Sequence, residues 1–289
     1  MAQQPLPSYL DEARMDRRRV ALVAAASIAA AVGLGALASA CGGEDSTTGK
    51  RLTHATRITA GPEATSAFTN AYGWSITLSR IDLSVGAFHY FDGAPVTARL
   101  HRPRPLLDRL ARWALPEAHA HPGHYQPGDA MGQMTEPTTV DLAKGPADLA
   151  PSAAVSGVYR SARFTFGAPP RGPLADELGD AVILVEGLAT KAGEARPFRV
   201  AAVAADVLDA KGNPLVAGCV FEEADVQENG AITLLVKPSV WLDQIDFTEV
   251  PASADGQPVT LEPATVPYKA FTRGLEKGTA YVFSYAAAA

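Results

Sequence analysis

Hydrophobic and polar residues alternate with a period of two along most of the chain beyond residue 70, as they do in half-buried β-strands. The alternation is clear over Trp74–Leu78. It continues over Ile81–Phe91, but one residue out of phase. A change of phase inside one strand predicts a β-bulge near Arg80.

Further period-two or continuous apolar segments follow, separated by turn-forming residues such as Asn229-Gly230 and Asp255-Gly256. The predicted strands are Val158–Phe166, Ala181–Ala189, Phe198–Leu208, Val216–Phe221, Ala231–Val236 and Ala280–Tyr285. Many short strands with Gly and Pro between them predict an all-β fold, an antiparallel, immunoglobulin-like β-sandwich of about seven to nine strands. One domain over residues 63–289 is expected, because no second composition regime or repeat is present.

Two stretches depart from this pattern. Pro105–Leu115 has the apolar spacing of a short helix, and Val240–Phe247 fits either a helical turn or a strand. No strand pattern is visible over residues 93–138, which predicts a long insertion between strands.

The N-terminal residues resemble a bacterial lipoprotein signal. Arg17-Arg18-Arg19 precede an uncharged apolar stretch, Val20–Ala40, and Cys41 follows small residues. We therefore expect a signal peptide over residues 1–40, lipidation of Cys41 and a flexible tether over 41–62, with outer-membrane attachment facing the periplasm or the cell surface. An uncleaved transmembrane anchor is the alternative, because 21 residues can span a bilayer.

Charge and cysteine content narrow the function. The net charge of −6 and the lack of a basic stretch argue against nucleic-acid binding. With Cys41 lipidated, Cys219 is the remaining cysteine, and its apolar surroundings predict a buried, inert thiol.

The chemistry-bearing residues gather inside the insertion. Five of the eight histidines and methionines beyond Cys41 fall within residues 119–134: His119, His121, His124, Met131 and Met134. Imidazoles suit Cu²⁺ or Zn²⁺, whereas thioethers suit Cu⁺, so an exported site with both ligand types indicates copper first and zinc second. A solvated loop whose histidines and methionines bind nothing is the alternative.

His89 closes the strand that leads into this insertion. It shares the alternation of Ile81 and Val85, so its side chain is expected to face the core, either as a packed histidine or as a further metal ligand. His54 and His101 are expected to be idle.

The order of several short segments resembles a known family. These segments are Leu78–Leu83, the His-Pro-Gly-His stretch, Val140–Leu142, Gly157–Gly167 and Val185–Gly187, covering about residues 70–250. This order is similar to the periplasmic copper-binding β-sandwich proteins associated with methanobactin uptake, and to uncharacterised lipoproteins of myxobacteria. The resemblance implies a β-sandwich and copper. It assigns no residue roles, because the family's Met-Trp-rich segment is absent and neither Trp74 nor Trp241 can be matched to its tryptophan-derived ligand.

Three functions are compatible with the sequence. The first is a membrane-anchored protein that binds a metal ion for storage, delivery or sequestration, with an outer-membrane transporter or a redox partner. The second is a metal-independent structural or adhesion module that binds a protein or a glycan. The third, and the least favoured, is a metallohydrolase with Asp129 or Glu136 as its base, because no catalytic motif accompanies the histidines.

Overall fold

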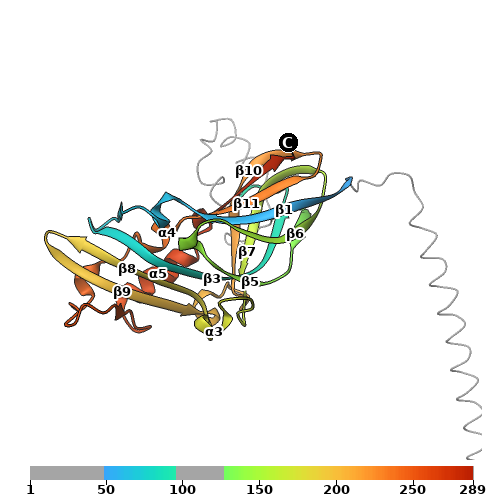
Figure 1. Cartoon of the computed structure of the whole chain (residues 1–289). Coiled ribbons are helices and arrows are strands. Elements are labelled where there is room, and N and C mark those ends of the chain that lie inside the picture. The colour runs from blue at the N-terminus through green and yellow to red at the C-terminus, as the bar shows by residue number, and fades with distance from the viewer. Residues whose placement is uncertain (1–48, 96–126, 289) are drawn as a thin grey trace, which may run out of the picture. The chain divides into compact units, whose positions relative to one another are not determined.

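The computed structural model describes residues 49–95 and 127–288, and these form a mostly β protein (Figure 1). The described residues belong to one compact unit. The strands are β1 (Arg51–Ala60), β2 (Phe68–Thr69), β3 (Ser75–Phe91), β4 (Ala130–Met134), β5 (Thr138–Asp141), β6 (Ala147–Val155), β7 (Gly157–Phe166), β8 (Ala181–Lys191), β9 (Glu194–Val203), β10 (Leu215–Val226), β11 (Gly230–Val236), β12 (Val259–Thr260) and β13 (Tyr281–Ala287). The helices are α3 (Ala175–Leu178), α4 (Pro238–Leu242) and α5 (Val266–Leu275), with 3-10 turns at Pro62–Ala64, Leu142–Lys144, Ala204–Val207, Phe247–Glu249 and Gly278–Ala280.

All thirteen strands of the described residues belong to one mixed sheet. In part of this sheet each strand is hydrogen-bonded to the next, and the last strand is hydrogen-bonded to the first. We call this part the closed sheet. Its strand order is β3, β4, β6, β1, β11, β13, β10, β7 and back to β3. Most pairs are antiparallel, but β1–β11, β10–β13 and β9–β12 are parallel. The all-β prediction is therefore confirmed, whereas the immunoglobulin-like sandwich is not.

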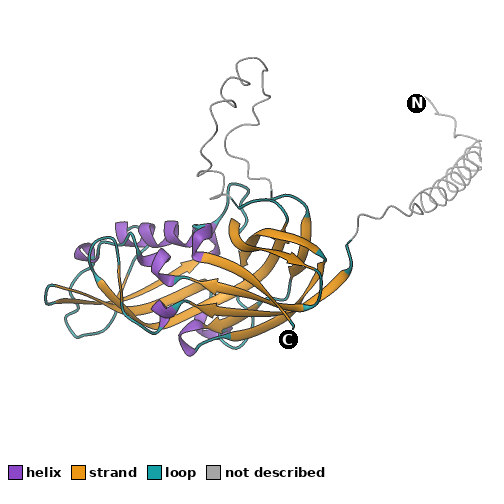
Figure 2. Cartoon of the chain, turned by 90° about the horizontal axis from the view of Figure 1, so that it is seen from above, coloured by secondary structure: helices purple, strands orange, loops and turns teal. Residues whose placement is uncertain are grey.

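The long strand β3 joins the closed sheet to a flatter extension. Its first half pairs with β8, which continues to β9 and β12, and its second half pairs with β4 and β7. Helices α4 and α5 pack against each other over the extension (Figures 1 and 2). One apolar core runs through both parts, from Trp74 and Phe198 to Phe88 and Phe283.

The structure corrects two expected boundaries. Residues 51–60, expected to be tether, form β1, which pairs with β6 and β11. The insertion expected over residues 93–138 contains β4 and the start of β5 in its last nine residues. The helix expected at Pro105–Leu115 lies outside the described residues, and Val240–Leu242 form the end of α4.

The predicted strands over residues 158–285 are present, with shifted ends. The strand before Pro238 ends at Val236, as expected for a residue that donates no backbone hydrogen bond. Among the described residues, no helix is both long and apolar enough to cross a membrane.

Two bulges shape β3. The first lies between Leu78 and Arg80, where the register against β8 shifts, and it confirms the predicted bulge. The second lies between Val85 and Phe88, where three steps along β3 match two along β7. This second bulge reverses the alternation again, so the expectation that His89 faces the core is wrong. Phe88 and Tyr90 are fully buried instead, and His89 is half-buried on the other face.

Gly86 makes the second bulge possible. A Cβ atom at this position would lie 2.9 Å from the carbonyl oxygen of Thr165 and 3.0 Å from that of Phe166, closer than real Cβ contacts. Both obstacles are backbone atoms of β7, so no side chain can move aside.

We expect Gly86→Ala to lower the free energy of unfolding by about 2–4 kcal/mol, because the strands must separate to admit a methyl group. Urea unfolding followed by circular dichroism measures this loss. The matched control is Thr77→Ser on the exposed part of β3, with an expected change within about 0.5 kcal/mol. Equal stability of the Gly86 variant and the wild type would contradict the close approach.

Candidate functional site

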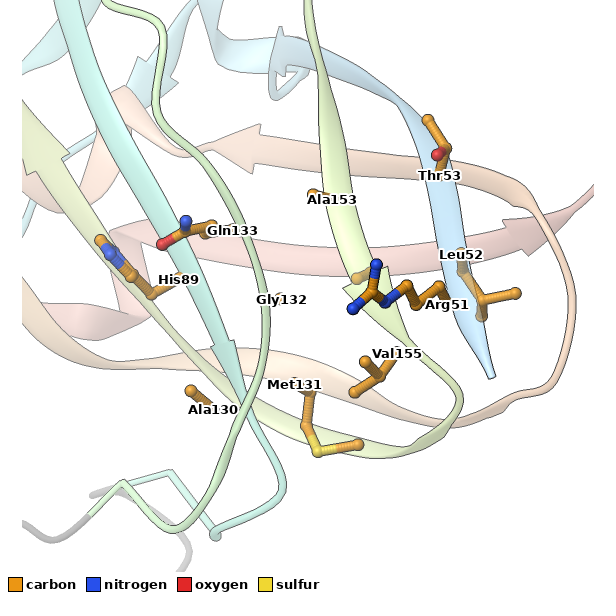
Figure 3. Close-up of a pocket in the computed structure, with 11 residues that line it drawn as sticks. Arg51, Leu52, Thr53, His89, Ala130, Met131, Gly132, Gln133, Ala153 and Val155 are labelled. Atoms are coloured by element: carbon orange, nitrogen blue, oxygen red, sulfur yellow. The ribbon is translucent and has the colours of Figure 1, made fainter. Parts of the chain in front are cut away.

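An open pocket of about 540 Å³ lies where β3, β4, β6 and β1 run side by side (Figure 3). Its volume falls within the range of small-ligand sites. Arg51 and Thr53 come from β1, His89 from β3, Met131 and Gln133 from β4, and Val155 from β6.

Small residues make the pocket hollow. Ala130, Gly132, Ala153 and Ala154 line it and carry at most a methyl group. A Cβ at Gly132 would lie 2.8 Å from both the Ala153 carbonyl oxygen and the Ala154 Cβ, so β4 and β6 approach closely here. The longer side chains around these residues therefore surround an apolar floor.

A bulge in each of two strands brings His89 and Met131 to the same pocket. The β3 bulge turns His89 away from the core. In β4, Met131 is the extra residue, because Tyr90 pairs with Gly132 and Phe91 with Ala130. Bulges commonly re-aim a side chain in this way. The phenol of Tyr159 fixes this corner by donating to the carbonyls of Met131 and Val155, at 3.0 and 2.7 Å.

His89 is held as a neutral imidazole. Burial, and then the positive charge of Arg163, lower its pKa below the ordinary 6.5. Arg163 pairs with His89 across β3 and β7, and its guanidinium lies 5.7 Å from the centre of the Phe91 ring. The His89 Nδ1 atom is buried and has no hydrogen-bond partner. A neutral imidazole with a free nitrogen is the form that ligates metals.

The polypeptide leaves and rejoins the sheet at one narrow place beside the pocket, which we call the neck. There the Gly93 amide donates to the Pro127 carbonyl at 2.9 Å, and the Asp129 amide donates to the Asp92 carboxylate at 2.7 Å. His119, His121 and His124 belong to the segment between the two sides of the neck and lie outside the described residues, as does Cys41.

Other predicted residues lie away from the pocket. Met134 is 1% exposed and packs in the core opposite Phe88. Asp129 and Glu136 are exposed and do not line the pocket. Cys219 is fully buried, and burial raises the pKa of its thiol to about 12, as expected for an inert cysteine.

His54, which was expected to be idle, is a polar residue in the core. It is 0% exposed in β1, neither ring nitrogen has a hydrogen-bond partner, and its imidazole packs edge-on against Tyr285. Nearby, the Ser152 hydroxyl is hydrogen-bonded to the hydroxyls of Thr56 and Tyr90. The sequence contains a signal for this strand. Every second residue, at Leu52, His54, Thr56 and Ile58, is buried, and the residues between them are exposed.

Within residues 49–95 and 127–288, no three His, Cys, Asp or Glu side chains are grouped so as to hold a metal ion. No protein-family model matches the chain, and neither a curated protein nor a solved structure does.

Burial lowers the pKa of His54 below the 6.5 of an unfolded histidine, so the folded state binds this proton less readily than the unfolded state. Stability should therefore fall as the pH drops below about 6.5. We expect His54→Phe, which keeps the packing against Tyr285, to lose less stability than the wild type between pH 7.5 and pH 5. Urea unfolding at both pH values measures the difference.

The matched control is Thr77→Ser, which retains both histidines and should keep the full acid sensitivity. His89→Gln should lose part of it as well, because burial and Arg163 also lower the pKa of His89. Identical pH dependence in the His54→Phe variant and the wild type would show that His54 does not titrate below its unfolded value.

Proposed function

We propose that this is an exported, lipid-anchored protein that binds a metal ion, copper first and zinc second, beside the pocket. The observation that carries the proposal is the position of the neck, which adjoins the pocket lined by His89 and Met131. The segment that the neck holds carries His119, His121 and His124 in its sequence.

Chain length supports this ligand set. His124 precedes Pro127 by three residues, and three residues of polypeptide span at most about 11 Å. His89 precedes Gly93 by four residues, and Met131 follows Pro127 by four. In the sequence, imidazoles and a thioether therefore lie within four residues of both sides of the neck. Met134 has no part in this set because its side chain is in the core.

The charges favour Cu⁺ over divalent ions. The guanidinium of Arg163 faces His89, and its repulsion of a bound cation scales with the charge of that cation. A monovalent ion is therefore opposed half as strongly as Zn²⁺ or Cu²⁺. A thioether adds preference for Cu⁺, because zinc is rarely bound by methionine.

Membrane attachment through Cys41, in the outer membrane, completes the proposal. Cys41 precedes the first strand by ten residues, which leaves a tether of residues 41–50 in place of the longer one expected. A role in storage, delivery or sequestration needs no general base, and neither Asp129 nor Glu136 lines the pocket. A transporter or a redox partner would receive the metal. The copper-binding family resemblance remains part of this proposal.

Elemental analysis of residues 42–289, produced in the periplasm and purified without chelator or affinity tag, tests the proposal. We expect about one equivalent of copper in the wild type and none in the variant with His119, His121 and His124 changed to Ala. Met131→Leu should weaken Cu⁺ binding by roughly tenfold while leaving stability nearly unchanged.

The control is His101→Ala, a histidine outside the proposed ligand set. No metal in the wild type, together with no tight uptake of added Cu⁺, Cu²⁺ or Zn²⁺, would overturn the proposal. The protein would then be assigned to the metal-independent group that binds a protein or a glycan.

A further inference from the structure

The side of the pocket formed by β1 carries a cation, Arg51, that no described residue neutralises. Arg51 lines the pocket, and within the described part of the chain its guanidinium has no carboxylate partner. Of the residues that the structure describes, no Asp or Glu lines the pocket. Since the protein as a whole has a net charge of −6, a pocket without acidic residues is a local reversal of its charge.

A second arginine on the same strand shows the contrast. Arg57 is on the same exposed face of β1, and it forms an ion pair with Asp148 at 2.8 Å. Both arginines are exposed, but only Arg51 borders a hollow. The free donors of Arg51 are therefore available to a ligand in the pocket.

The opposite side of the pocket is also electropositive. Figure 3 shows Arg51 and His89 on opposite sides, with Gln133 near His89. Arg163 pairs with His89 across β3 and β7, so a second positive charge lies beside this histidine. The apolar floor of Ala130, Gly132, Ala153 and Ala154 completes the lining.

We propose that this pocket binds a small amphipathic anion, a carboxylate or phosphate that carries a single apolar chain. The guanidinium of Arg51 binds the anionic group through charge-assisted hydrogen bonds, and the chain lies over the alanine floor. The amide of Gln133 supplies a further donor. The inference needs no bound metal, so it stands or falls separately from the proposed function.

Calorimetric titration of residues 42–289 with octanoate and with octyl phosphate tests this inference. Octanol, which has the same chain without the charge, is the uncharged comparison. We expect both anions to bind at least tenfold more tightly than octanol, and Arg51→Gln to reduce the binding of the anions roughly tenfold without affecting octanol. Arg57→Gln is the matched control and should bind like the wild type.

Proton NMR of His89, assigned with His89→Gln, gives a second readout. At constant pH, octanoate should shift the ring resonances of His89, whereas octanol should leave them nearly unchanged.

Three results would overturn the inference: equal binding by the Arg51→Gln and Arg57→Gln variants, octanol binding as tightly as octanoate, or His89 ring resonances that do not move at saturating octanoate. A fourth would do so as well, namely binding to phosphatidylglycerol vesicles with no binding of the single-chain anions, because it would assign Arg51 to a membrane surface.

Discussion

The second bulge of β3 is the constraint on which the pocket depends. It requires Gly86, because the carbonyls of Thr165 and Phe166 leave no room for a Cβ atom. Because of the bulge, Val85 before it and Phe88 after it both point into the core, although they are three residues apart. His89 is turned outward as a consequence, towards β4. Without the bulge, the alternation set by Ile81 would bury His89, and the pocket would lack its imidazole.

The neighbouring strand responds to the same geometry. Met131 is the extra residue of β4 opposite the end of β3, and Tyr159 fixes its carbonyl together with that of Val155. The two bulged strands and the close contact at Gly132 leave a hollow that small residues do not fill. The core therefore supports the site directly, because the fully buried Tyr159 is hydrogen-bonded to β4 at Met131 and to β6 at Val155, and both residues line the pocket.

Much of the fold was predictable, because period-two alternation depends only on neighbouring residues. It identified six strands beyond residue 157 and the bulge near Arg80. It failed at β1, whose inward residues include His54 and Thr56 and so do not read as apolar. It also failed at Gly86, because a glycine in a strand does not reveal which neighbouring backbone lies close to it. The parallel pairing of β1 with β11 joins segments about 175 residues apart, and no local pattern specifies such a contact. Of the candidate site, the sequence supplied His89 and Met131 but missed Arg51, which was assigned to the tether.

We propose that imidazoles and a thioether beside the neck share one copper ion. X-ray absorption spectroscopy at the copper edge, on protein loaded with Cu⁺, identifies the atoms bound to that ion. We expect scattering from imidazole nitrogen together with sulfur, and loss of the sulfur contribution in the Met131→Leu variant. A first shell of oxygen alone, or one unchanged when His119, His121 and His124 are replaced, would contradict it.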